Sequence, residues 1–350
     1  MKTTPPDMKF LVIGAGAIGT YIGGSLALKG ENVVFLERPD VAAEIRSRGL
    51  TLSLEDGEHH LPNPKLVTGW EQILASGPFD AAVFALKSYH TPAFLQSLPN
   101  KESLPPFLCL SNGVDNETAL AQALGNDKVI AGTVTSAVGR RAAGNIALER
   151  LRGVGVAEEH PISKRLAAVL NAAGLNAETY PDAAAMKWSK MLTNLVTNAS
   201  SAILDISPTE VFAHPDLYRL EIAQLREALA VMRAQQIRVI NLPGTPVKAL
   251  AFAARRLPLW LSRPLLNKAV AGGRGGKMPS FHIDLHSGRK GSEVAYLNGA
   301  VVRVGQRVGV PTPVNKALTE TLMALVRGKM PLSNFRKQPE KLLARTSKAP

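Results

Sequence analysis

Short apolar runs alternate with amphipathic segments over the first half of the chain. The runs are Lys9–Ile13 (KFLVI), Asn32–Leu36 (NVVFL), Asp80–Leu86 (DAAVFAL), Phe107–Leu110 (FLCL) and Val129–Val134 (VIAGTV), with a further run at Gly153–Ala157. Such runs are typical of parallel strands that are buried on both faces. A helical pattern of small residues follows the first run from Ile18 to about Lys29, and Gly30 closes it. The alternation predicts a parallel sheet with right-handed helical crossovers.

From about Pro181 the pattern changes to helical periodicity, and strand signals disappear. The helical segments are Ala183–Ala202, Leu217–Gln236, Glu293–Val308 and Asn315–Arg327. A chain of 350 residues is long enough for two domains. The sequence therefore predicts an α/β fold with a Rossmann-type dinucleotide-binding domain at 8–180 and an all-helical substrate-binding domain at 181–335. Residues 1–7 and 336–350 are expected to be flexible tails.

A glycine-rich loop follows the first predicted strand and opens the first predicted helix. It reads Gly14-Ala15-Gly16-Ala17-Ile18-Gly19. In this GxGxxG arrangement the first glycine allows a tight turn, the second lets the backbone approach a pyrophosphate, and the third packs the helix on the strand. The helix N-terminus then favours the anionic group. The alternative is a glycine-rich turn in an unrelated α/β protein.

The end of the second predicted strand carries two opposite signals for the cofactor. Glu37 stands where an acid would hold the ribose 2′-hydroxyl of NAD, and Arg38 follows it, where it could clamp the 2′-phosphate of NADP. The alternative for Arg38 is a solvated loop charge beside a proline.

Lys190, Asn194 and Asn198 are spaced i, i+4, i+8, which predicts one stripe of a single helix. Asparagine is a poor helix former, so two asparagines aligned with a lysine favour a polar ligand over a solvated face. A solvated face remains the alternative.

Glu293 begins a predicted helix with an apolar stripe through Leu297, Val301, Val304 and Val308. Its carboxylate would point along this buried stripe, where it needs a partner such as Lys190 or a substrate hydroxyl. The alternative is a first-turn acid that the helix dipole favours.

These blocks occur together in an order that resembles the ketopantoate reductase (2-dehydropantoate 2-reductase) family over about residues 8–328. The resemblance rests on Gly14–Gly19, Arg38, Leu86-Lys87, Ser111-Asn112-Gly113, Trp188-Ser-Lys190-x3-Asn194-x3-Asn198, Ser280-x3-Asp284 and Ser292-Glu293-x4-Asn298-Gly299. It implies a reductase that converts 2-dehydropantoate to (R)-pantoate with NADPH, a step toward pantothenate and coenzyme A.

The resemblance also implies a role for each matched residue. Lys190 would be the general acid that protonates the substrate carbonyl oxygen. Glu293 would orient the substrate hydroxyl, hold Lys190 in place and lie against the cofactor. Asn194 and Asn198 would bind the substrate hydroxyl and its neighbours, and Ser280 its carboxylate.

The resemblance also implies which residues would bind the cofactor. The Gly14–Gly19 loop would hold the phosphates, and Arg38 and Lys87 would contact the adenosine side of NADP. Asn112 would lie between the cofactor and the lysine and contact both cofactor and substrate. The active site would be a cleft between the two domains.

The sequence departs from the family pattern at three places. Lys277 stands where many members carry an asparagine, which leaves the substrate preference open. Glu37 leaves NAD possible beside NADP. Residues 243–276 form an insertion relative to compact members, ending in the hinge-like Gly272–Gly276.

The formal net charge of +13 is concentrated in residues 241–277 and 331–350, so the charge does not indicate a nucleic-acid-binding fold. The insertion mixes basic and large apolar residues, and we expect it to act as a lid, a packing element or a homodimer contact. Docking on an anionic membrane is the less favoured alternative, because two prolines argue against a long amphipathic helix.

The remaining signals concern compartment and metals. Cys109 is the single cysteine, so it forms no internal disulfide or cysteine metal cluster, and we expect a cytoplasmic protein. We expect no signal peptide, because the residues before the glycine loop hold no apolar stretch long enough, and no spanning helix, because no uninterrupted apolar run reaches about 20 residues. His282 and His286 have the i, i+4 spacing of metal ligands but lack a HExxH motif or a cysteine partner, so we expect a structural role and no metal.

Two other function classes stay open beside the reductase that uses a small 2-oxo acid. One is a related NAD(P)-dependent 2-oxo or 3-hydroxy acid dehydrogenase with a different substrate. The other is a non-catalytic binding protein, either a dinucleotide sensor or a membrane or nucleic-acid binder that uses the basic insertion.

Overall fold

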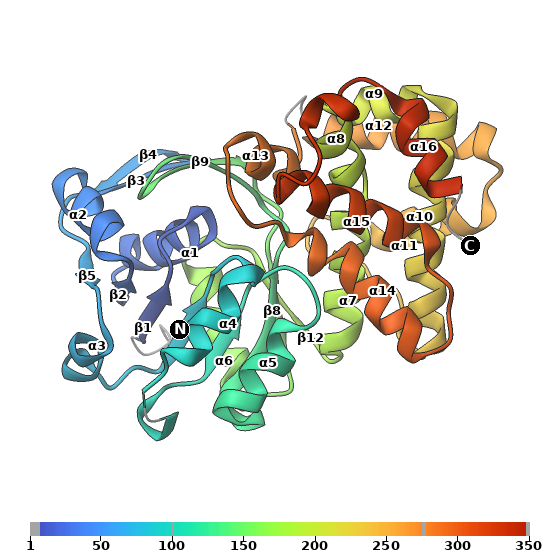
Figure 1. Cartoon of the computed structure of the whole chain (residues 1–350). Helices are drawn as coiled ribbons and strands as arrows, with labels where there is room; N and C mark the ends of the chain where they lie inside the picture. The colour runs from blue at the N-terminus through green and yellow to red at the C-terminus, as the bar shows by residue number, and fades with distance from the viewer. Residues whose placement is uncertain (1–7, 100, 275–277, 348–350) are drawn as a thin grey trace. The chain divides into compact units, whose positions relative to one another are not determined.

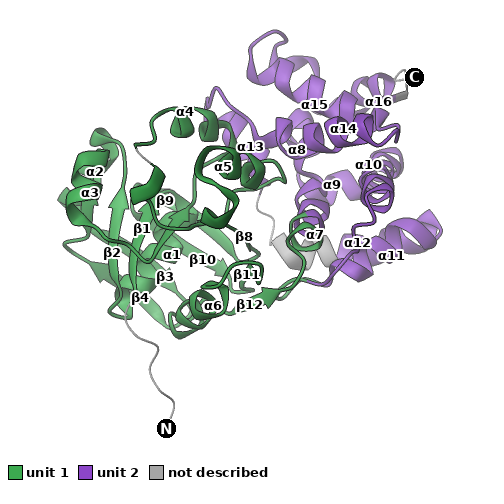
Figure 2. Cartoon of the chain, turned by 90° about the horizontal axis from the view of Figure 1, so that it is seen from below, with its two compact units in different colours: residues 1–187, 242–245 green, residues 188–241, 246–350 purple. Residues whose placement is uncertain are grey.

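The computed structural model describes residues 8–99, 101–274 and 278–347 (Figure 1). Lys277 and the end of the Gly272–Gly276 segment lie outside these residues. The chain divides into two compact units (Figure 2). Unit 1 comprises Met1–Lys187 with Leu242–Thr245, and unit 2 comprises Trp188–Asn241 with Pro246–Pro350.

Unit 1 contains an eight-stranded sheet in the order β12-β11-β8-β7-β6-β1-β2-β5. The strands are β1 (Lys9–Ile13), β2 (Asn32–Leu36), β5 (Lys65–Val67), β6 (Ala81–Phe84), β7 (Phe107–Cys109), β8 (Val129–Val134), β11 (Val154–Ala157) and β12 (Ala177–Tyr180). All neighbours pair in parallel except β8 and β11, which are antiparallel. The predicted parallel-sheet domain is therefore confirmed.

Strand β1 lies at the centre of the sheet and supplies both of its hydrophobic cores. Phe10 and Val12 belong to one core, whereas Leu11 and Ile13 belong to the other. Because successive side chains of a strand point to opposite faces, a continuous apolar run is what a sheet covered on both faces requires.

A second sheet of four strands, in the order β4-β3-β10-β9, was not predicted. Its strands are β3 (Leu50–Leu54), β4 (Gly57–Leu61), β9 (Ala137–Ala142) and β10 (Asn145–Arg150). It packs on α1 (Ala17–Leu28), whose other side packs on the large sheet (Figure 1). A Cβ atom on Gly23 would lie 2.6 Å from the Phe35 ring, and one on Gly24 would lie 2.7 Å from Leu52. The small residues of α1 are therefore needed to fit a helix between two sheets.

The helices that flank these strands in unit 1 are short. They are α2 (Pro39–Arg48), α3 (Trp70–Ser76), α4 (Thr91–Gln96), α5 (Asn116–Leu124) and α6 (Ser163–Ala172). Helix α7 (Ala183–Leu195) begins in unit 1 and continues into unit 2.

Every regular element in the described part of unit 2 is helical. The elements after α7 are α8 (Asn198–Leu204), α9 (Pro208–Ala213), α10 (Pro215–Ala234), α11 (Val247–Arg256), α12 (Leu259–Arg274), α13 (Ser280–His286), the 3-10 turn η4 (Glu293–Ala295), α14 (Asn298–Arg307), α15 (Pro313–Val326) and α16 (Pro339–Ser347). The predicted helical region is confirmed. The flexible tail expected at 336–350 was wrong over α16, because Leu342 is fully buried where this helix packs on α10 and α15.

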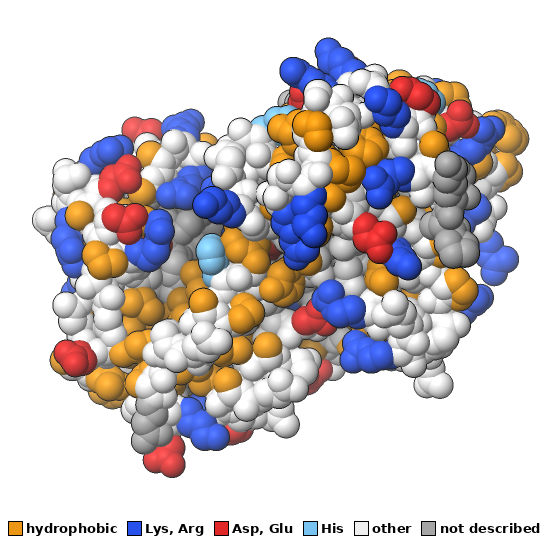
Figure 3. Space-filling view, viewed as in Figure 1, with side chains coloured by type: hydrophobic (Ala, Val, Ile, Leu, Met, Phe, Trp, Pro, Cys, Tyr) orange, Lys and Arg blue, Asp and Glu red, His pale blue; other side chains and the backbone are white. Residues whose placement is uncertain are grey.

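The insertion forms α11 and α12, which pack on α10 and α9. Helix α12 runs through Pro264, contrary to the prediction that prolines would prevent a long helix. Two arginines of the insertion contact other helices of unit 2, because Arg255 on α11 donates to the Leu229 carbonyl at 3.0 Å and Arg263 on α12 donates to the Phe212 carbonyl at 2.9 Å. Lys and Arg side chains are nevertheless spread over the face shown in Figure 3. Some of the basic side chains that contribute to the positive net charge therefore stabilise the packing of these helices.

The helix predicted at Ala183–Ala202 is interrupted, so the stripe predicted for Lys190, Asn194 and Asn198 was wrong. Helix α7 ends at Leu195, and α8 begins at Asn198. Thr197 between them has a φ of +55°, a left-handed conformation that is costly for a β-branched residue.

Two buried side chains of α10 satisfy the backbone that this break exposes. Glu221 accepts the Thr197 N–H at 2.7 Å and the Ser200 hydroxyl. Gln224 donates to the Leu195 carbonyl at 3.3 Å and to the Glu221 carboxylate at 2.6 Å. Both α10 side chains are fully buried. Because unpaired polar groups are costly in a protein interior, this pair stabilises the turn that separates the two helices.

We expect Glu221→Ala to lower the free energy of unfolding by about 2–4 kcal/mol, because it removes the buried carboxylate that accepts from the Thr197 N–H and the Ser200 hydroxyl. Urea denaturation followed by circular dichroism measures this difference. The control is Glu44→Ala, which removes an exposed ion pair with Arg48 and should change stability by no more than about 0.5 kcal/mol. Equal losses in the two variants would show that the α10 carboxylate does not hold the break.

Candidate active site

The glycine loop has the geometry that dinucleotide binding requires. Gly14 has a φ of +88°, which fits the tight turn after β1. A Cβ atom on Gly16 would meet nothing within 4 Å, so backbone at this position is open to an approaching group. A Cβ atom on Gly19 would lie 1.8 Å from the Gly14 carbonyl oxygen, so only glycine fits here. Each glycine therefore meets the physical need predicted for it.

Helix α1 begins directly at this loop, with Gly16 as its N-cap and without a side-chain cap hydrogen bond. The first N–H groups of a helix have no partner inside the helix, and the helix dipole adds positive potential there. The loop and the start of α1 (residues 14–19) can therefore hold an anionic pyrophosphate.

Glu37 and Arg38 lie beside this loop but differ in what they contact. The Glu37 carboxylate accepts the Ala15 N–H at 2.7 Å, so it is held against the glycine loop. The Arg38 side chain is 73% exposed, and its guanidinium lies 3.4 Å from the Asp40 carboxylate. Both cofactor signals of the sequence are thus present at the end of β2, one fixed on the loop and one facing solvent.

Lys87 and Asn112 follow two neighbouring strands, β6 and β7. The loops that carry them are joined, because the Ser111 hydroxyl donates to the Leu86 carbonyl at 2.7 Å and the Ser88 hydroxyl donates to the Asn112 carbonyl at 2.7 Å. Since β1 pairs with β6, the glycine loop belongs to the same sheet edge. Ligands of open α/β sheets bind at the carboxyl ends of the strands, which is where these three loops lie.

Lys187 is a functional candidate that the sequence reasoning missed. Its ammonium group is buried, and it donates to the Ser111 carbonyl at 2.7 Å and the Gly132 carbonyl at 3.2 Å. It also forms an ion pair of 2.7 Å with Glu117. Through its hydrogen bond to the Ser111 carbonyl, Lys187 fixes the turn that carries Asn112. The signal that the sequence offers for it is a lysine flanked by the large apolar residues Met186 and Trp188.

Unit 2 brings three of the predicted substrate residues together. Asn198, which is buried, donates to the Asn194 carbonyl at 3.0 Å and to the Ser280 hydroxyl at 3.3 Å. Its amide oxygen accepts the Phe281 N–H at 3.0 Å. The start of α8 is thereby tied to the start of α13, and Ser280 is held at an exposed position. In this arrangement the Asn198 amide positions Ser280.

Lys190 and Glu293 occupy different kinds of position in the same unit. Lys190 lies partly buried on α7, one turn before Asn194. Glu293 is buried as predicted, but it lies on the turn η4 and not on the predicted helix, because α14 begins only at Asn298. The Leu297 N–H donates to the Glu293 carbonyl at 2.9 Å and closes this turn.

Gln224, which helps to hold the break between α7 and α8, also anchors the segment that follows Glu293. Asn298 donates to the Gln224 side-chain carbonyl at 3.0 Å and to the Asn315 side-chain carbonyl at 3.0 Å. Asn315 in turn donates to Glu227 at 2.7 Å, and burial raises the pKa of the Glu227 carboxyl. We call Glu221, Gln224, Asn298, Asn315 and Glu227 the buried polar network. It fixes the starts of both α8 and α14.

The comparisons with known proteins cover nearly the whole chain. Residues 10–158 match the family described as Ketopantoate reductase PanE/ApbA, and residues 182–326 match Ketopantoate reductase PanE/ApbA C terminal. A 2-dehydropantoate 2-reductase from Archaeoglobus fulgidus is 28% identical over 324 residues, which are 91% of this chain and 96% of that protein.

Two solved structures have similar folds. The PanE/ApbA family ketopantoate reductase from Ralstonia eutropha JMP134 has a TM-score of 0.77 and 26% identity, and the match covers 92% of this chain and 99% of that one. D-mandelate dehydrogenase with NADH and anilino(oxo)acetate has a TM-score of 0.74 at 22% identity with the same coverage, which shows a shared fold. Among the described residues, no helix combines the length and apolar character needed to cross a membrane.

Proposed function

The chain belongs to the ketopantoate reductase family, and we propose that it reduces 2-dehydropantoate to (R)-pantoate with NADPH in the cytoplasm. The product is a precursor of pantothenate and coenzyme A. The observation that carries the proposal is that Lys190, Asn194, Asn198, Ser280 and Glu293 occur in family order on a unit that holds three of them together by hydrogen bonds.

The residues at the β-sheet edge fit a nicotinamide dinucleotide. Open space at Gly16 and the N-terminus of α1 suit the pyrophosphate, and Arg38 is exposed and able to turn toward a 2′-phosphate. Lys87 and Asn112 would complete the site from the next two strands. When bound, NADPH supplies a hydride from the nicotinamide ring to the substrate carbonyl carbon.

The chain's own residues supply the proton and the orientation. Lys190 would donate a proton from Nζ to the carbonyl oxygen as negative charge grows on it, so that the product is a 2-hydroxy acid. Glu293 would accept the substrate hydroxyl and hold the lysine in its protonated form. Ser280 would donate to the substrate carboxylate, and Asn198 would fix the serine hydroxyl for this role.

A second candidate is the NADH-dependent reduction of a different 2-oxo acid. The Glu37 carboxylate is held 2.7 Å from the Ala15 N–H, where it favours a cofactor with a free ribose 2′-hydroxyl. D-mandelate dehydrogenase, which shares the fold, is named in complex with NADH. Cofactor and substrate preference therefore have to be measured together.

We expect Lys190→Ala to lower kcat by about 10²–10⁴-fold, because the transition state loses its proton donor. NADPH affinity, measured by fluorescence titration, should change by less than about twofold, since the glycine loop is intact. Lys316→Ala, which removes an exposed lysine of α15, is the matched control and should retain full turnover. Turnover that is unchanged in Lys190→Ala would reject the assigned acid.

We expect Arg38→Ala and Glu37→Ala to have opposite effects on cofactor choice. Loss of Arg38 should raise the KM for NADPH about tenfold or more and leave the KM for NADH unchanged, because only NADPH carries the 2′-phosphate. Loss of Glu37 should weaken NADH more than NADPH. If Arg38→Ala weakens the two cofactors equally, the 2′-phosphate clamp is wrong.

A further inference from the structure

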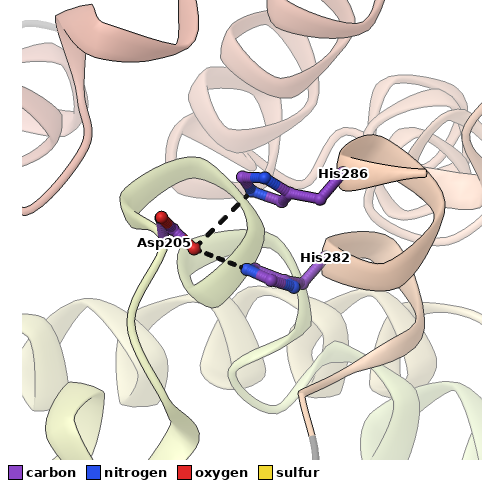
Figure 4. A group of neighbouring side chains, drawn as sticks. All are labelled: Asp205, His282 and His286. Carbon is purple, nitrogen blue, oxygen red and sulfur yellow. Dashed lines mark hydrogen bonds and ion pairs between the residues drawn. The ribbon is translucent and has the colours of Figure 1, made fainter. Parts of the chain in front are cut away.

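Three side chains with metal-ligating atoms converge in unit 2, and none of them is assigned to the proposed reaction. Asp205 caps the C-terminus of α8, and His282 and His286 lie on α13 (Figure 4). The Asp205 oxygen lies 2.7 Å from Nε2 of His282 and 3.8 Å from Nε2 of His286. All three ligand atoms lie within 4.8 Å of one another. We call these residues the Asp205 cluster.

The two histidines are placed on one face of α13 by their i, i+4 spacing. Their rings stack with centroids 4.1 Å apart and an interplanar angle of 26°, and the Nε2 atoms of both rings face the same oxygen of Asp205. The same spacing on a helix lets two histidines share a zinc ion in metalloenzymes. The sequence indicated only the two histidines, whereas the fold places the Asp205 carboxylate beside them as a third possible metal ligand.

The carboxylate comes from a strained backbone position. Asp205 has a φ of +53°, in the left-handed region, at the end of α8. This conformation turns its side chain toward α13, which packs against α8. Left-handed residues persist where surrounding contacts fix them, and here the contacts are those of the cluster.

The spacing of the donors suits a first-row dication. Zinc ligands lie about 2.0–2.2 Å from the ion, which places tetrahedral ligand atoms about 3.3 Å apart. The observed separations of 2.7 and 3.8 Å lie on either side of this value, so small rotations of the two rings would equalise them. The His286 side chain is 30% exposed, which leaves access for water as a fourth ligand.

The outer contact of the carboxylate matches that of a metal ligand. Arg336 Nε lies 2.9 Å from Oδ2 of Asp205, while Oδ1 faces the imidazoles. Carboxylates that bind metals are usually oriented by such a second contact. The positive charge of Arg336 also opposes a dication, so the expected ion is exchangeable and not permanently held.

We propose that the Asp205 cluster binds a transition-metal dication such as Zn²⁺ through His282 Nε2, His286 Nε2 and Asp205 Oδ1. Imidazole and carboxylate together favour zinc over calcium or magnesium. The ion would join the C-terminal end of α8 to α13. The N-terminal end of α8 is already joined to α13 through Asn198 and Ser280. Metal binding would therefore stiffen the helix pair that presents Ser280.

The test is a calorimetric titration of ZnCl₂ into the full chain after removal of metals with EDTA. We expect one site per chain, with an affinity that falls about tenfold or more in His286→Gln and in Asp205→Asn. His286→Gln keeps the 2.7 Å contact between His282 and Asp205, so its fold should be retained, which circular dichroism verifies. Zinc should also raise Tm in the unmodified chain and not in His286→Gln.

The control is His59→Gln, because His59 forms a similar contact of 2.8 Å with Asp56 but without a second histidine at i+4. This variant should bind zinc as the unmodified chain does. Zinc binding that is equal in His286→Gln and the unmodified chain would place the ion elsewhere. Absence of zinc binding to the unmodified chain would leave a histidine–aspartate hydrogen bond alone and overturn the proposal.

Discussion

The candidate site residues of unit 2 depend on a buried carboxylate, Glu221, that accepts hydrogen bonds at the break between α7 and α8. Glu221 accepts hydrogen bonds from the Thr197 N–H and the Ser200 hydroxyl, so the chain can end α7 at Leu195 and start α8 after two intervening residues. That break turns Asn198 to the start of a helix, where its amide reaches Ser280. A buried carboxylate is costly unless its oxygens are satisfied, so Glu221 and the groups it binds have to be retained together.

The buried polar network links the hydrogen bonds at this helix break to the segment that carries Glu293. Gln224 contacts both Glu221 and Asn298, and Asn298 starts α14 directly after the turn that holds Glu293. One helix, α10, thus fixes two segments that carry predicted site residues. In unit 1 the corresponding constraint is steric, because α1 has to fit between two sheets and approach its own loop. Glycine at position 19 meets that constraint, because a Cβ atom there would lie 1.8 Å from the Gly14 carbonyl oxygen.

The features that could be predicted from the sequence are those that depend on a local pattern of apolar residues or glycines. The bounds of β1, β2 and β8 follow from apolar runs, and the glycine loop follows from spacing. The second sheet was missed because β4 and β9 contain no fully buried residue and so lack a core signal. The break at Thr197 was missed because its acceptor lies 24 residues away on α10. Lys187 and the third member of the Asp205 cluster were missed for the same reason, since their partners are distant in sequence.

The identity of the preferred 2-oxo acid substrate decides between the proposed function and its alternative. The most direct measurement is kcat/KM for NADPH-dependent reduction of 2-dehydropantoate against a panel of other 2-oxo acids, aromatic members included. The proposal predicts that 2-dehydropantoate exceeds every other member by about tenfold or more, because Ser280 and Glu293 would bind its carboxylate and its hydroxyl together. A higher kcat/KM for a 2-oxo acid without that hydroxyl would contradict it.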